Sequence, residues 1–105
     1  MFGGLFKLYR LRSNFVNLSD FADAFALKGY CYEISIFSHW QQGRRVPTKR
    51  IVLLALLTLF IERKAIRSLS EANQFLESAG HGYLTQTEQE KFRLVVSNDF
   101  YQQKF

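Results

Sequence analysis

The side chains of this chain that could recognise a ligand gather in one short stretch. Ser35, Ser38 and His39 are hydrogen-bonding residues spaced three or four positions apart, which puts them on one face of a helix. The basic pair Arg44-Arg45 follows shortly afterwards. Such a face can form hydrogen bonds to a polar surface, and guanidinium groups beside it can neutralise anionic groups on that surface.

The same stretch contains the signals of a helix that is anchored on one side. Phe37 and Trp40, three positions apart, share the face opposite the polar one and are expected to be buried. Gly43 suits the left-handed residue that ends a helix, and Pro47 ends regular structure ahead of the next one. A short helix with a small polar face and a cationic exit is typical of proteins that read the major groove of DNA.

A family resemblance supports this interpretation. The pattern Ser35-x-x-Ser38-x-Trp40-Gln41-x-Gly43-Arg44-Arg45-x-Pro47 resembles the recognition helix and following turn of the lambda-repressor-like, XRE-type helix-turn-helix domains. A second run, Glu71-Ala72-Asn73-x-Phe75-Leu76-x-x-Ala79-Gly80-x-x-x-Leu84-Thr85, looks like the segment that follows this domain in many bacterial regulators. The resemblance implies sequence-specific binding of double-stranded DNA by a bacterial or phage-type transcriptional regulator.

The resemblance and the side-chain chemistry together predict two sets of contacts. The residues expected to touch base edges are Ile34, Ser35, Ser38 and His39. The residues expected to touch the DNA backbone are Lys28, Gln42, Arg44, Arg45, Lys49 and Arg50. Because one recognition helix reads only a few base pairs, we also expect a homodimer, at least on DNA.

One segment departs from the family pattern. The turn at residues 30–33 is about three residues longer than the usual one, and it places Glu33 where a Ser or Thr normally begins the recognition helix. A carboxylate there would repel phosphate. Two alternatives therefore stay open: a helical protein-interaction module that has this fold but does not bind DNA, and the N-terminal part of a larger sensor.

Composition and charge agree with a small helical domain. The chain has 105 residues, 48% of them hydrophobic and 16% aromatic, which is ample for a core. Its net charge is +5, and residues 1–67 hold eleven Lys and Arg against four acidic residues, whereas residues 68–105 carry a net −2. The basic part thus coincides with the expected DNA-binding part.

The predicted fold class is all-α. We expect a compact bundle of five to six short helices, with a lambda-repressor-like helix-turn-helix domain at 1–67 and a C-terminal helical extension at 68–105 packed on it. The expected starts are Ser19 for the second helix and Thr48 for an apolar fourth helix that is buried on more than one side. Capping boxes at 68–71 and 85–88 begin the last two helices, and residues 98–105 are expected to fray.

Other chemistries lack the residues they need. The sequence contains no nucleotide-binding glycine loop, paired-cysteine zinc motif or nucleophile elbow, so we expect no enzyme, no cofactor and no metal. Cys31 is expected to be a partly buried structural thiol. The longest apolar run, 51–61, is too short to span a bilayer, so we expect no membrane and a cytoplasmic location.

Overall fold

The computed structural model describes the backbone of residues 1–95 and the side chains of residues 1–92, and in this part the chain is all-helical. Six helices are present there: α1 Phe2–Arg12, α2 Leu18–Leu27, α3 Ile34–Gln41, α4 Arg50–Glu62, α5 Leu69–Ser78 and α6 Gln86–Val95. The predicted all-α fold is therefore confirmed. The expected fraying of 98–105 lies outside the described residues.

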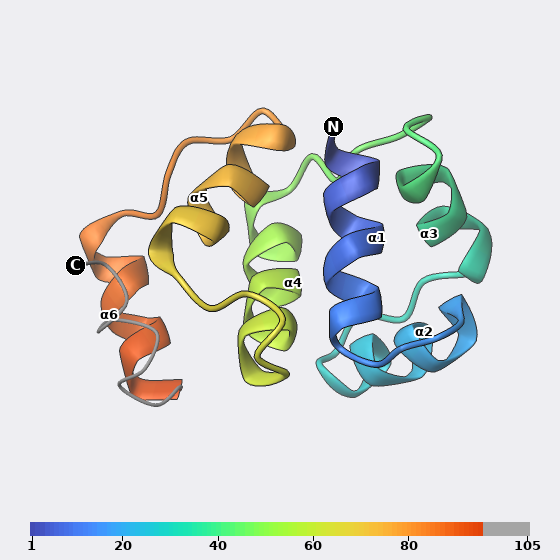
Figure 1. Cartoon of the computed structure of the whole chain (residues 1–105), viewed down its shortest axis with the longest axis horizontal. Coiled ribbons are helices and arrows are strands. Elements are labelled where there is room, and N and C mark those ends of the chain that lie inside the picture. The colour runs from blue at the N-terminus through green and yellow to red at the C-terminus, as the bar shows by residue number, and fades with distance from the viewer. Residues whose placement is uncertain (96–105) are drawn as a thin grey trace.

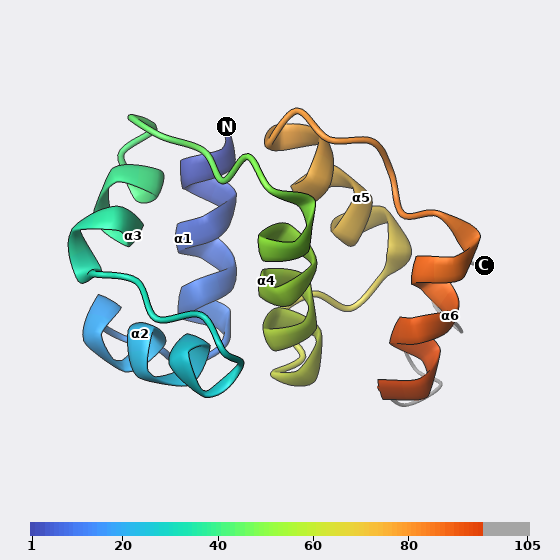
Figure 2. The ribbon, with the colours of Figure 1, turned by 180° about the vertical axis from the view of Figure 1, so that it is seen from behind.

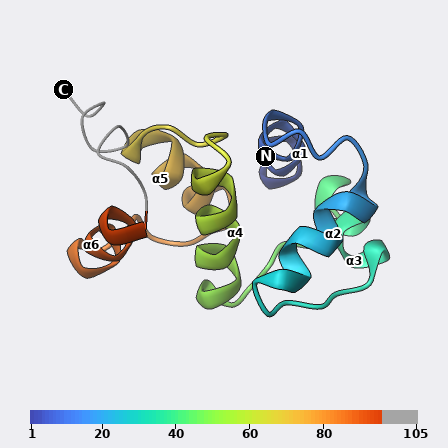
Figure 3. The same ribbon diagram turned by 90° about the horizontal axis from the view of Figure 1, so that it is seen from below.

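The helices are arranged around α1 and α4, which stand side by side (Figures 1 and 2). On one side of α1 stands α3, and α2 lies across the lower ends of both, as the view from below also shows (Figure 3). On the other side α5 packs near α4, and α6 lies beyond it at the far end of the molecule.

An aromatic core joins these helices. Phe6 of α1 is fully buried, and its ring centroid lies 5.1 Å from that of Phe21 in α2, 5.7 Å from Trp40 in α3 and 6.3 Å from Phe60 in α4. Phe75 of α5 packs against Phe60 from the other side at 5.7 Å. The first helix of the expected C-terminal extension thus shares the core of residues 1–67, and the boundary itself stays a prediction.

The first five helices all end in the same way. In each, the second residue after the helix has a positive φ, and the N–H of the following residue bonds back to the last turn. The residues at the positive φ are Asn14, Gly29, Gly43, Lys64 and Gly80. Gly43 was predicted as the residue that ends its helix, and Gly29, Gly80 and Asn14 also suit this conformation, whereas Lys64 carries no such signal in the sequence.

Two predicted helix starts are wrong. α2 begins at Leu18, because the side chain of Asn17 accepts a hydrogen bond from the Asp20 N–H at 2.8 Å and caps the helix before Ser19 can do so. α4 begins at Arg50. Its N-cap is Lys49, which has an extended backbone, so Thr48 lies outside the helix. The chain needs these extended residues to cross from the end of α3 to the top of α4 (Figure 1).

The two capping boxes differ in how completely they form. Thr85 and Glu88 bond reciprocally, with each side chain accepting from the other residue's N–H. The Ser68 hydroxyl accepts from the Glu71 N–H at 3.1 Å, but the Glu71 carboxylate accepts from the Arg67 N–H and pairs with Arg12. The second half of that box is replaced by a contact to α1, which fastens α5 to it.

Two expectations on burial have different outcomes. α4 is buried on more than one side as predicted, although Ile51 on its outer face is exposed. The expectation for Cys31 is wrong, since this thiol is exposed. It lies in the segment between α2 and α3, which has no regular secondary structure at residues 30–33.

Candidate functional site

The inner face of α3 is anchored as the sequence predicts. Phe37 is fully buried, with its ring centroid 5.1 Å from that of Phe21 and 5.2 Å from that of Trp40. Trp40 is 5% exposed and packs edge-on against Phe6. Burial of two aromatic side chains one turn apart fixes the rotation of this short helix about its own axis. Truncation of either one to alanine would lower the free energy of unfolding by about 3–5 kcal/mol.

The outer face of α3 is less uniform than the spacing suggested. Ile34 and Ser35 are exposed, whereas Ser38 and His39 are only half-exposed. The Ser38 hydroxyl accepts a hydrogen bond from the Gln42 side-chain amide at 3.3 Å, so Gln42 lies along the helix. The Nδ1 atom of His39 is buried and has no hydrogen-bond partner in the described part of the chain. Of the polar residues on this face, Ser35 is thus the most freely accessible.

A close backbone contact sets the distance between α3 and α1. A Cβ atom added at Gly3 would lie 2.5 Å from the Gln41 carbonyl oxygen and 2.6 Å from that of Trp40. Both distances are below 3.0 Å, the closest approach that real Cβ atoms show. The last turn of α3 therefore rests directly on the backbone of α1, and only glycine fits at position 3. The local sequence around Gly3 does not indicate this contact, because its partner α3 is distant along the chain.

A buried arginine holds the same end of α3. Arg10 is 5% exposed, and its Nη1 donates to the carbonyl oxygens of Phe15 at 2.6 Å and Val16 at 3.0 Å. Its Nη2 donates to Gln41 Oε1 at 3.1 Å. Burial lowers the pKa of Arg10 below its ordinary value. This side chain joins α1, the connector before α2 and the last residue of α3.

Arg10 lies on the buried face of α1, although a positively charged side chain is ordinarily exposed. Phe2, Phe6 and Arg10 are spaced four residues apart and share one face of the helix. The helical spacing of these three residues is therefore the signal for the position of Arg10. Its two terminal nitrogen atoms donate to three oxygen atoms in place of water, whereas the buried Nε has no hydrogen-bond partner within the described residues.

The segment that leaves α3 has a fixed direction. Gly43 has a φ of +79°, and the N–H of Arg44 donates to the His39 carbonyl oxygen at 2.9 Å. We call residues 43–49 the exit loop. Its cationic side chains, Arg44, Arg45 and Lys49, are exposed, and within residues 1–92 they form no salt bridge. They are therefore available to an anionic ligand.

The other two predicted cations are already paired. Lys28 binds Glu62 at the C-terminal end of α4. Lys49 lies at the N-terminal end of this helix, which has 13 residues and is therefore about 20 Å long, so the two lysines are far apart. Arg50 binds the Glu88 carboxylate with two bonds of 2.9 and 2.8 Å and also donates to the carbonyls of Gly82 and Tyr83. The structure does not place Lys28 with the exit-loop cations, and Arg50 fastens α4 to α6.

This ion pair also changes the titration of both partners. The hydrogen bond from Arg50 is the largest cause that lowers the pKa of Glu88 from 4.5 to about 2. The same bond raises the pKa of Arg50. Sequence reasoning missed Glu88 as a partner, since the two residues are 38 positions apart.

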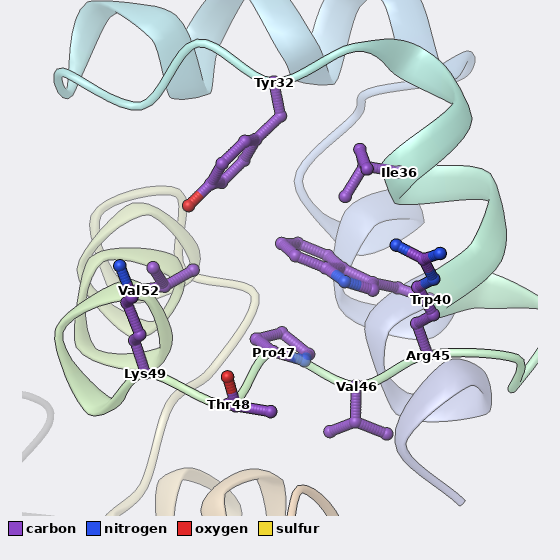
Figure 4. Close-up of a pocket in the computed structure, with 9 residues that line it drawn as sticks. All are labelled: Tyr32, Ile36, Trp40, Arg45, Val46, Pro47, Thr48, Lys49 and Val52. Atoms are coloured by element: carbon purple, nitrogen blue, oxygen red, sulfur yellow. The ribbon is translucent and has the colours of Figure 1, made fainter.

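A pocket opens beside the exit loop (Figure 4). It has a volume of about 440 Å³ and lies between α3, the exit loop and the start of α4. Trp40 extends into it from α3, and Tyr32 extends into it from the turn before α3. The nine residues that line it are Tyr32, Ile36, Trp40, Arg45, Val46, Pro47, Thr48, Lys49 and Val52. The pocket was not predicted, because its walls come from four separate segments.

Comparison with known proteins gives no relative from which to assign a function. No protein-family model, curated protein or solved structure matches this chain. No helix within residues 1–95 combines the length and the apolar character needed to cross a membrane. In the same part of the chain, no three His, Cys, Asp or Glu side chains form a group that could hold a metal ion.

Proposed function

We propose that this protein binds double-stranded DNA in a sequence-specific manner and regulates transcription, as a helix-turn-helix domain of the lambda-repressor-like, XRE type. In this proposal α2 and α3 are the two helices of the motif, and α3 enters the major groove. The observation that supports it best is the combination of an anchored helix with an accessible polar face and, directly after it, a cationic loop that forms no salt bridge within residues 1–92.

Reading of sequence is assigned to the outer face of α3. The Ser35 hydroxyl can donate to or accept from a base edge, and Ile34, which is 46% exposed, can contact a thymine methyl group. Ser38 and His39 lie on the same face and contribute through the polar atoms that their partial burial leaves open. The contacts of Gly3 and Arg10 to the last turn of α3 keep this face in a fixed position before DNA arrives.

Binding of the phosphate backbone is assigned to the exit loop. Arg44, Arg45 and Lys49 would each neutralise a phosphate, which contributes affinity and register but carries no sequence information. The backbone N–H groups of Arg44 and Arg45 bond to the His39 carbonyl and hold the start of the loop against the end of α3, which supports this assignment for the two arginines. Lys28 and Arg50 are left out of this set because each already binds a carboxylate.

Binding as a dimer is part of the proposal. An eight-residue helix such as α3 is about 12 Å long and spans only a few base pairs. Two copies related by a two-fold axis would read half-sites about one helical turn apart. Sedimentation with a selected duplex tests this, and a strict one-to-one complex on a non-palindromic site would contradict it.

The decisive experiment is selection of bound sequences from a random duplex pool, followed by salt titrations of variants. Ser35→Ala should weaken binding to the selected duplex by about 1–3 kcal/mol and leave a scrambled duplex unaffected. Arg45→Gln should weaken both duplexes and lower the slope of log affinity against log salt by about one unit. Lys64→Gln is the matched control, since it removes one charge at the opposite end of α4.

Two outcomes would count against the proposal. If Arg45→Gln alters sequence preference while Ser35→Ala has no effect, the two roles are assigned to the wrong residues. If the unmodified protein shows no salt-dependent binding to any duplex, DNA binding is refuted. The protein-interaction module would then be favoured, with the exposed Tyr32 and Ile34 as its contact residues.

A further inference from the structure

We propose that the pocket beside the exit loop binds a small aromatic carboxylic acid. Its volume of about 440 Å³ lies within the range of sites that hold small molecules. The proposal rests on two features of its lining, which are an aromatic and apolar wall and two cations, Arg45 and Lys49, that lie on opposite sides of the pocket (Figure 4).

The wall suits a flat apolar ring. The rings of Tyr32 and Trp40 meet edge to face, with centroids 6.0 Å apart and planes at 75°, and both extend into the pocket (Figure 4). Ile36, Pro47 and Val52 complete the apolar surface. An aromatic ring placed here can stack on Tyr32, which is 38% exposed, and meet the small exposed part of Trp40 with its edge, which is a geometry that aromatic groups prefer.

The cations suit a carboxylate. Arg45 and Lys49 line the pocket and form no salt bridge within residues 1–92, and no acidic residue is among the nine that line it in the described structure. A guanidinium group binds a carboxylate with two parallel hydrogen bonds. Figure 4 shows the Tyr32 hydroxyl pointing across the pocket toward the start of α4, on the side of Lys49. The site therefore combines ring stacking with recognition of one negative charge.

The same cations give the ligand a regulatory effect, a step that rests on the proposed function. Arg45 and Lys49 are two of the three residues assigned to DNA phosphates, and a carboxylate bound to either of them would compete with a phosphate for that charge. The acid should therefore lower the affinity for DNA, and DNA should lower the affinity for the acid by the same factor. This links the amount of an aromatic acid to release of the operator.

Trp40 provides a direct measurement of the ligand, independent of DNA. It is the only tryptophan of the chain and it lines the pocket, so its fluorescence reports on occupancy. We would titrate the protein with benzoate, phenylacetate and 3-phenylpropionate, and with phenylacetamide as the uncharged match of phenylacetate. At least one acid should give a saturable change, and phenylacetamide should bind roughly ten-fold more weakly than phenylacetate for loss of a charge-assisted hydrogen bond.

Variants test which cation carries the preference for the acid. Arg45→Gln should remove the difference between phenylacetate and phenylacetamide. Arg44→Gln changes the neighbouring residue, which does not line the pocket, and should keep that difference. No saturable change with any of the three acids, or equal binding of acid and amide, would overturn the proposal.

The competition measurement separates this inference from the proposed function. Fluorescence saturation by an acid without any duplex binding would keep the ligand site and remove the proposed function. Duplex binding without any fluorescence response would remove the ligand site and keep the proposed function. If both ligands bind but the acid leaves the affinity for DNA unchanged, the regulatory step is wrong.

Discussion

Replacement of Gly3 by Ala tests the packing of the candidate recognition helix directly. Alanine places its Cβ 2.5 Å from one carbonyl oxygen and 2.6 Å from another at the end of α3. Ordinary contacts of a Cβ atom begin near 3.4 Å, so the two helices must separate by almost 1 Å or bend locally. Backbone atoms offer no rotamer by which to escape the overlap, and the whole last turn of α3 has to move.

The expected cost follows from two opposing terms. Overpacking of a well-packed contact costs about 1–3 kcal/mol. Replacement of glycine by alanine inside a helix raises the free energy of unfolding by about 1 kcal/mol. The adjacent Gly4 isolates the second term, because nothing in the described structure lies within 4 Å of a Cβ added there. Gly4→Ala should therefore stabilise the protein by about 0.5–1 kcal/mol, and Gly3→Ala should destabilise it by up to about 2 kcal/mol.

Urea unfolding followed by circular dichroism measures both variants against the unmodified protein. We expect the free energies of unfolding of the two variants to differ by about 1–3 kcal/mol, with Gly3→Ala the less stable. If Gly3→Ala is as stable as Gly4→Ala, α1 and α3 are not in backbone contact. The account of how α3 is positioned would then be refuted, whatever the protein binds.

Three further substitutions test other parts of the structure. Trp40→Ala should destabilise the protein by about 3–5 kcal/mol, and an unchanged melting temperature would mean that this side chain is not part of the core. Lys64→Gly should raise the free energy of unfolding by about 0.5–1 kcal/mol because it relieves a φ of +62°, whereas Asn14→Gly should change little, since asparagine tolerates this conformation. The pKa of Glu88 is lowered in the folded state from 4.5 to about 2, so its ion pair contributes fully above pH 4.5 and is lost as the pH falls toward 2. Glu88→Gln should lower the free energy of unfolding by about 1–2 kcal/mol at pH 7, which is less than the full pKa difference implies because water reaches the pair. In acid unfolding curves, the difference in stability between Glu88→Gln and the control Glu90→Gln should vanish near pH 2.

Local sequence patterns predicted most of the helical framework. The three-residue spacing of Phe37 and Trp40 placed them on one buried face, and glycines at 29, 43 and 80 stand at the ends of three helices. These signals work because the hydrogen bonds and side-chain neighbours of a helix lie within about four residues of each other. The errors at Ser19 and Thr48 are also smaller than one helical turn, since each helix start was misplaced by only one or two residues.

The candidate site was predicted only in part. The sequence identified the polar face of α3 and the cations after it, but it could not distinguish Arg45, which is unpaired in the described part of the chain, from Arg50, which is held by Glu88. A residue's charge is visible in the sequence, whereas its partner is set by packing between helices that are distant along the chain. The ordinary expectation that a surface arginine is free therefore failed for Arg50.

The sequence by itself determined that this protein is helical, which faces of its helices are apolar and where several of them end. The tertiary structure alone decided that Gly3 allows α1 to touch α3, that Arg10 is buried, and that a pocket opens beside the exit loop. Periodicity and capping involve neighbours within one helical turn, so a linear pattern records them. Close backbone contacts, buried charges and pockets arise where several segments meet, and the geometry of that meeting is fixed only when the whole core has packed.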